Sequence, residues 1–146
     1  MHLRIGYFED FKGADTILVC GDDDGLQRLA DNLRTLEDRN AKPVNLHLLP
    51  FVQVHRCVQL TANPVDRELG VRRIGAEPSF SWHHSEEGWL ESAEKIEVVA
   101  RGSHGHCYLG EIAAGEARVM VSTDEYDEAW WGDQSDRREE NHGSSI

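Results

Sequence analysis

The sequence lacks the features that would cross-link a chain by disulfides or place it in a membrane. It has only three cysteines in 146 residues, and no apolar run approaches the ~20 residues of a membrane-spanning helix. Its first residues also lack the apolar core of a signal peptide. We therefore expect a cytoplasmic protein without membrane contact, with Cys20, Cys57 and Cys107 as reduced thiols in an apolar core.

Basic residues are scarce as well. The 15 Lys and Arg stand against 27 Asp and Glu, which gives a net charge of −12. A protein with a net negative charge repels the phosphate backbone of nucleic acids, so we expect no nucleic-acid partner. The same charge attracts basic proteins. Residues 124–140 alone carry eight acids and two bases. Charge of this size also serves solubility, so by itself it does not establish a partner.

No complete catalytic or cofactor signature occurs in the chain. It contains no Gly-x-Ser-x-Gly elbow, no phosphate-binding loop and no dinucleotide fingerprint. The run Asp22-Asp23-Asp24 lacks the alternate spacing of a calcium loop and is better suited to capping a helix. We expect no cofactor, and a non-enzymatic protein is favoured over an enzyme.

Two stretches have the period of amphipathic helices. The first begins at Asp24, whose spacing from Gln27 is that of an N-cap and its reciprocal partner, and it ends near Arg39. The second begins at Ser85 and stops at Gly102. The apolar stripes are formed by Leu26, Leu29, Ala30, Leu33 and Leu36 in the first helix and by Trp89, Leu90, Ala93, Ile96 and Ala100 in the second.

Strand-like runs fill much of the remaining chain, and the stretch 61–78 is the least regular. These runs are 3–8, 16–20, 44–49, 51–60, 80–82, 107–109 and 118–122. The continuous apolar run 16–20 predicts a central strand, and Trp82 and Trp89 are expected in the core. We predict an α+β fold with one domain over 1–132, a mostly antiparallel sheet of five to seven strands, two helices on one face, and a disordered acidic tail at 133–146.

The histidines near residue 105 suggest a metal site as the main chemical alternative. His104, His106 and Cys107 lie within four residues, and His83-His84 would complete a zinc site. Alternate strand positions, however, place the two imidazoles on one face and the thiol on the other, and no Cys-x-x-Cys or His-Glu-x-x-His motif accompanies them. We expect no metal, and a metal-binding protein or metal-dependent enzyme that uses these three residues is kept as the alternative.

Aromatic side chains are interleaved with acids near the C-terminus. The segment is formed by the aromatic residues Tyr126, Trp130 and Trp131 and the acids Asp124, Glu125, Asp127 and Glu128. Aromatic anchors ringed by charge are typical of protein interfaces, so these seven residues are the predicted partner-binding site. The alternative is that one of the two tryptophans folds back onto the core.

Four motifs in the last part of the chain form a recognisable series. They are Ser81-Trp82, Ser85-Glu86-Glu87-Gly88-Trp89, Gly105-His106-Cys107-Tyr108-Leu109 and Val121-Ser122-Thr123-Asp124-Glu125-Tyr126. With these motifs the chain resembles a family of small bacterial immunity proteins of polymorphic toxin systems. The resemblance implies a non-enzymatic α+β protein that binds one cognate toxin and blocks it in the producing cell. Toxins that act on nucleic acid present a basic cleft, which an acidic inhibitor would fill. A homodimer is left open.

Overall fold

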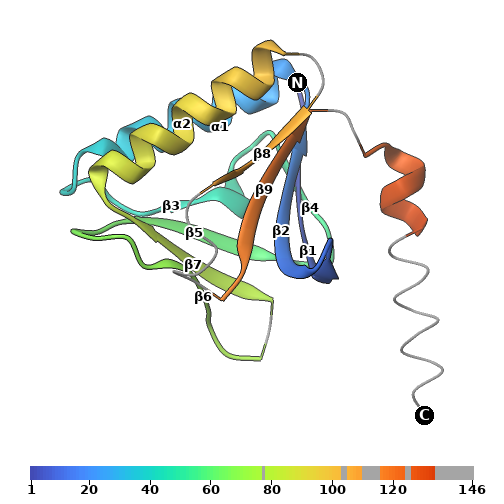
Figure 1. Cartoon of the computed structure of the whole chain (residues 1–146), viewed down its shortest axis with the longest axis horizontal. Coiled ribbons are helices and arrows are strands. Elements are labelled where there is room, and N and C mark those ends of the chain that lie inside the picture. Colours follow the sequence, from blue (N-terminus) through green and yellow to red (C-terminus); the bar gives the residue numbers. More distant parts are fainter. Residues whose placement is uncertain (77, 103–104, 110–115, 124–125, 134–146) are drawn as a thin grey trace.

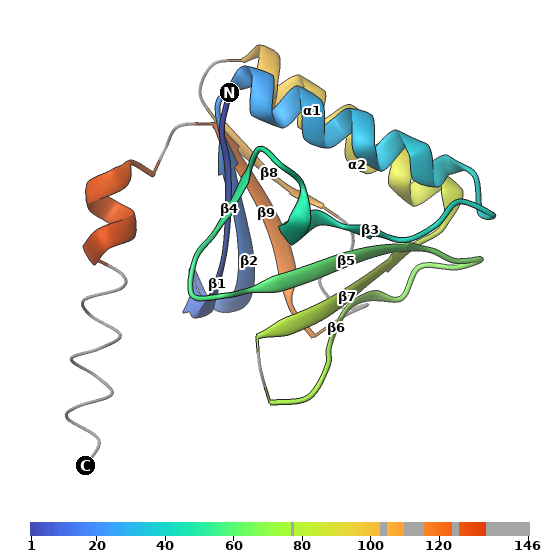
Figure 2. The same cartoon turned by 180° about the vertical axis from the view of Figure 1, so that it is seen from behind.

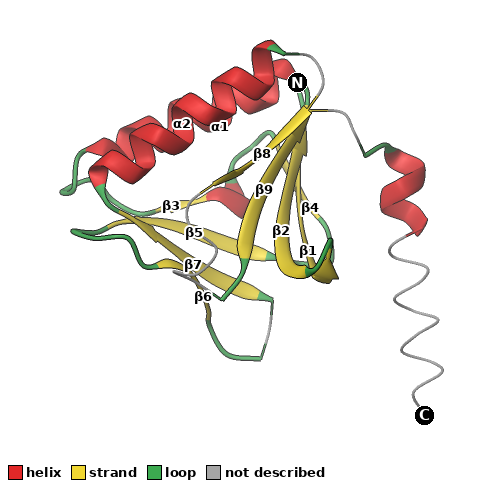
Figure 3. Cartoon of the chain, viewed as in Figure 1, coloured by secondary structure: helices red, strands yellow, loops and turns green. Residues whose placement is uncertain are grey.

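The computed structural model describes residues 1–76, 78–102, 105–109, 116–123 and 126–133. Over these residues the chain forms a single domain of the α+β class, as predicted, with two sheets and two long helices (Figures 1 and 3). The predicted single sheet is divided into sheets of five and four strands, and each combines parallel and antiparallel pairs. Residues 134–146 of the predicted tail lie outside the described residues.

The five-stranded sheet has the order β4-β1-β2-β9-β8. Its strands are β1 (Leu3–Phe11), β2 (Ala14–Gly21), β4 (Val52–Val54), β8 (Gly105–Leu109) and β9 (Arg118–Thr123). β2 lies in the centre, antiparallel to β1 and parallel to β9. Its residues 16–21 are all buried, which confirms the prediction of a central strand.

The four-stranded sheet has the order β3-β5-β7-β6. Its strands are β3 (Val44–Asn45), β5 (Gln59–Pro64), β6 (Gly70–Arg73) and β7 (Ser79–His84). Along β7 every second residue is buried, so Phe80, Trp82 and His84 face the interior.

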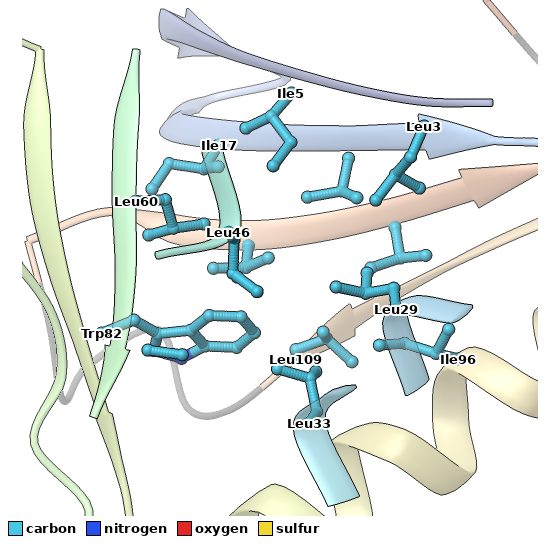
Figure 4. Close-up of a cluster of buried hydrophobic side chains, with 14 of the residues drawn as sticks. Leu3, Ile5, Ile17, Leu29, Leu33, Leu46, Leu60, Trp82, Ile96 and Leu109 are labelled. Atoms are coloured by element: carbon cyan, nitrogen blue, oxygen red, sulfur yellow. The ribbon is translucent and has the colours of Figure 1, made fainter. Parts of the chain in front are cut away.

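The helices α1 (Asp23–Arg34) and α2 (Glu86–Arg101) lie side by side along one side of the molecule, with both sheets below them in Figures 1 and 2. One core joins the two sheets and the two helices. Leu3, Ile5 and Ile17 come from the first sheet, Leu60 and Trp82 from the second, and Leu29, Leu33 and Ile96 from the helices (Figure 4). Trp82 and Trp89 are 2% and 0% exposed, with ring centroids 4.8 Å apart, so their predicted place in the core is confirmed.

The start of α1 differs from the prediction, whereas its apolar stripe does not. The N-cap is Asp22 rather than Asp24, because the Asp22 carboxylate accepts the Gly25 N–H at 2.8 Å. The helix ends at Arg34 and passes into the 3₁₀ turn η1 (Thr35–Glu37). All five predicted stripe residues are buried. In α2 both predicted boundaries, Ser85 and Gly102, are confirmed.

The predicted strands 44–49 and 51–60 are wrong over much of their length. Leu46–Leu48 forms the 3₁₀ turn η2, and the second run is broken where Arg56 and Cys57 have φ values of 54° and 57°. This left-handed backbone cannot continue a strand, so β4 and β5 enter different sheets. Cys57 is consequently exposed in a turn, and the prediction of a core thiol is wrong for it. Cys20 is buried and Cys107 is half-buried.

Candidate functional site

The segment 126–133 lies against the outer face of the five-stranded sheet, where it forms a helical turn over 128–133 (Figure 1). Alternate residues of the strands divide between the main core and this face. Trp131 is 4% exposed and packs here in a second small core with Phe8, Leu18 and Met120. Its indole therefore fastens the segment to the sheet.

A glycine in β1 allows this close packing. A Cβ on Gly6 would lie 2.7 Å from the Trp131 ring and 2.9 Å from the Phe8 ring. Any larger residue at this position would therefore displace one of the two rings. The outer face of β1 thus has a notch directly beneath the indole.

Two acids of the segment also hold it in place. The Asp127 carboxylate accepts the Trp130 backbone N–H at 2.9 Å and caps the helical turn. Glu128 pairs with Arg4 at 2.7 Å, and the Arg4 guanidinium lies 5.2 Å from the centroid of the Trp131 ring. The Glu128 side chain is nevertheless 86% exposed, whereas that of Arg4 is 16% exposed.

Beside the buried indole, three half-buried rings form what we call the aromatic platform: Phe11, Tyr126 and Trp130. The Tyr126 and Trp130 centroids are 4.5 Å apart, and Phe11 lies 5.9 Å from Tyr126 and 6.1 Å from Trp130. The tilted and edge-on contacts are those that aromatic rings prefer. The Lys12 ammonium lies within 6.0 Å of two of these rings, those of Phe11 and Tyr126.

Two open hollows of about 280 and 320 Å³ flank Trp131. Both are lined by Trp131, Arg4 and Glu128, so each has charges of both signs in its wall. The first is also lined by Gln53, Val54, His55 and Gly132, and the second by His2, Cys20, Tyr126 and Asp127. Shallow hollows with mixed charges beside aromatic rings suit the side chains of a protein partner.

The structure thus separates the seven predicted partner-binding residues into groups. Tyr126 and Trp130 are half-buried in the platform, and Asp127 and Glu128 are exposed at its border. Trp131 is buried and supports the others from beneath. Asp124 and Glu125 lie outside the described residues.

The residues of the metal alternative do not converge where the structure describes them. On β8, His106 is exposed on the outer face, 5.9 Å from Tyr108, whereas Cys107 packs against the main core. Burial raises the pKa of the Cys107 thiol, and nearby Lys95 lowers it only in part. His104 lies outside the described residues. Among the residues that are described, no three His, Cys, Asp or Glu side chains are grouped to hold a metal ion.

A polar cluster at the start of α2, in which His84 is buried and the Glu68 side chain is 44% exposed, was not found from the sequence. The loop after β5 is held at the end of β7 by the bonds from Val65 N–H to His84 O (3.0 Å) and from Leu69 N–H to His83 O (3.3 Å). Glu68 is thereby placed where its carboxylate accepts His84 Nδ1.

Ser85 completes this cluster. Its hydroxyl and its backbone N–H donate to Glu68 at 2.6 and 3.1 Å, and the same hydroxyl accepts the Gly88 N–H at 3.2 Å as the N-cap of α2. Burial raises the pKa of Glu68, but the bonds from Ser85 and His84 outweigh it and leave the pKa below its ordinary value. The Ser85 hydroxyl donates to a carboxylate and not to an imidazole, so the serine–histidine pair of an activated nucleophile is not formed by Ser85 and His84.

Comparison of the chain with protein-family models, with curated proteins and with solved structures found no match. Of the helices in the described part of the chain, none is both long and apolar enough to cross a membrane.

Proposed function

We propose that this protein is a non-enzymatic immunity protein that binds a basic bacterial toxin and neutralises it. The observation that carries the proposal is the aromatic platform. Tyr126 and Trp130 are presented half-buried on a surface that Trp131 fastens to the sheet, and exposed acids border them. Aromatic side chains that are already fixed lose little conformational freedom when a partner binds, so they make strong interface anchors.

Charge supports a basic partner. A net charge of −12 accelerates the encounter with a positively charged surface. At the platform itself, Glu128 has its side chain in solvent although it pairs with Arg4, so the carboxylate is able to contact a partner as well. Asp124 and Glu125 remain predicted contacts.

The surroundings of Ser85 and Cys107, two side chains that could act as nucleophiles, support a non-enzymatic role. The Ser85 hydroxyl is engaged as a helix cap and as a donor to Glu68. The Cys107 thiol has a raised pKa, which leaves it protonated and weakly nucleophilic at neutral pH. His106 and Cys107 also point to opposite faces of β8, which weighs against the metal-dependent alternative.

The test starts from the neighbouring gene, because an immunity gene lies beside the gene of its toxin. The toxin domain encoded there is purified, and its binding to this chain is measured by titration calorimetry. Trp130→Ala is expected to weaken binding by about 2 kcal/mol or more. Trp131→Ala is expected to destabilise the fold by about 3–5 kcal/mol, because it empties the second core.

The matched control is Val98→Ala, which changes a side chain that is 62% exposed on α2. It should leave both the affinity and the stability as they are. Wild-type affinity in a folded Trp130→Ala, Tyr126→Ala double variant would contradict the proposal. Stoichiometric zinc in the purified protein, lost on His106→Ala, would support the metal alternative instead.

A further inference from the structure

A further cavity, of about 290 Å³, lies at the start of α2. Figures 1 and 2 show this end of α2 on the side of the molecule away from the 128–133 turn. The cavity is formed between the loop that carries Glu68, the end of β7 and the first turns of α2. The most buried residues that line it are His84 and Ser92, each 2% exposed. The proposed toxin-binding surface does not use it.

His84 contributes a buried nitrogen that lacks a partner. Its ring packs edge-on between Trp82 and Trp89, with centroid distances of 5.3 and 4.8 Å, and Nδ1 donates to Glu68. Nε2 is buried and has no hydrogen-bond partner among the residues that the structure describes. With Nδ1 as the donor, Nε2 of the neutral ring is an acceptor. Buried polar atoms without a partner are rare, and His84 is one of the residues that line the cavity. We take this nitrogen to be the acceptor for a donor that enters there.

The anion position of the cavity is already filled. The N-terminus of a helix attracts an anion, and at α2 the Glu68 carboxylate occupies this place with two hydrogen bonds from Ser85. A further anion would meet this carboxylate at close range. A ligand that enters the cavity is therefore expected to carry donors and positive charge.

The charges at the mouth of the cavity also favour a positively charged ligand. Glu87 and Glu91 are exposed and line it together with Glu68, whereas Lys95 is the one basic residue among the described residues of the lining. Lys95 pairs with Glu91 at 3.2 Å. Three carboxylates against one ammonium favour a cation.

We propose that this cavity receives the guanidinium group of an arginine side chain of the basic partner. A guanidinium is a planar cation with five N–H donors, so it can donate to Nε2 and to a carboxylate together, and it stacks readily on aromatic rings. The source of the arginine rests on the proposed function, whereas the chemistry of the cavity does not. The cavity would then be a second anchor point, remote from the aromatic platform.

The cavity is tested on the full chain without any partner. Methylguanidinium chloride is titrated into isotopically labelled protein at constant ionic strength, and NMR follows the Gly88 and Ser92 amides and the His84 ring nitrogens. Saturable shifts in the millimolar range are expected, with the largest at Nε2 of His84. Tetramethylammonium, which has the same charge but no N–H donors, should cause none.

Variants at the mouth separate the cavity from general charge effects. Glu87→Gln with Glu91→Gln should weaken methylguanidinium binding about threefold or more, because attraction at the mouth is lost. Lys95→Met should strengthen it by removing a competing cation. The matched control is Glu94→Gln, an exposed acid of α2 that is not part of the lining and should leave binding unchanged.

Three results would overturn the inference: no saturable shift with methylguanidinium, equal shifts with tetramethylammonium, or shifts of these amides with acetate alone. They are distinguishable from a failure of the proposed function. If toxin binding requires Trp130 but methylguanidinium does not bind in the cavity, the inference is refuted and the proposed function stands. A cavity that binds the cation while the neighbouring toxin does not bind at all refutes the function and the partner as the source of the arginine.

Discussion

Trp130 and Trp131 are adjacent in the chain and have different surroundings. Consecutive residues of a helical turn point about 100° apart, so only one of two neighbours can face the sheet. Trp131 takes this position and is 4% exposed, whereas Trp130 stays half-buried in the platform. The sequence predicted an aromatic and acidic surface here, but it did not indicate which indole would support it.

Gly6 offers a direct test of how the segment is fastened. Gly6→Ala should destabilise the protein by about 1–3 kcal/mol, because its Cβ would lie 2.7 Å from the Trp131 ring. Denaturant unfolding followed by tryptophan fluorescence measures the change. The control is Gly132→Ala, since a Cβ there meets nothing within 4 Å. Equal stability of both variants would show that Trp131 does not lie in the notch above β1.

Glu68 makes stability depend on pH in a defined direction. Its pKa is lower in the folded protein than the ordinary value of 4.5, so its contribution is complete above the unfolded pKa and is lost as the pH falls through the folded pKa. Glu68→Gln removes this charge. The difference in unfolding free energy between wild type and variant should be constant near neutral pH and should shrink below about pH 4.5. A difference that grows on acidification would contradict this assignment.

At the scale of elements, the helices were predictable because their signals are local. The period of the apolar residues in α1 and the cap of α2 at Ser85 follow from neighbours three or four positions apart. The cap of α1 was misplaced by two residues, because each of the aspartates 22–24 is able to cap a helix. Asp22 also contacts the N-terminus, with Met1 N at 3.3 Å from its carboxylate, and the local sequence does not indicate this contact.

The strands were less predictable because their limits depend on distant partners. Nothing in the residue types at Arg56 and Cys57 indicates a left-handed backbone, which separates β4 from β5. The Glu68 cluster was missed for a related reason. Glu68 stands in an irregular stretch, 16 residues before His84, and only the pairing of the loop with β7 brings the two together.

The cap of α1 distinguishes the sequence-based prediction from the structure. Asp22→Ala should cost about 1–2 kcal/mol of unfolding free energy, because the Gly25 N–H loses its acceptor and the N-terminus loses an ion-pair partner. Asp24→Ala is the matched control and should cost less than about 0.5 kcal/mol, as an exposed acid of the first turn. Chemical denaturation measures the unfolding free energy of both variants. A larger loss in Asp24→Ala than in Asp22→Ala would show that Asp24 is the cap.

Charge is unevenly distributed over the whole molecule. The stretches 22–38 and 86–101, which contain α1 and α2, carry eleven acids and four bases, whereas 39–85, which contains the four-stranded sheet, carries six bases and three acids. The helices lie side by side (Figure 2), so the two stretches bring their net negative charge to one side of the molecule, which we call the acidic layer. This layer would orient the molecule as a basic partner approaches.

Charge and aromatic contacts should therefore act on different steps of toxin binding. Replacing Asp23, Asp31 and Glu94 by amides removes exposed charge from the acidic layer, so it should slow association and flatten its dependence on salt while dissociation changes little. Trp130→Ala should instead accelerate dissociation about thirtyfold or more and leave the salt dependence of association unchanged. Stopped-flow and surface plasmon resonance at several salt concentrations separate the two rates. An association rate that is independent of salt in the wild type would refute electrostatic steering, and the platform alone would then have to account for the affinity.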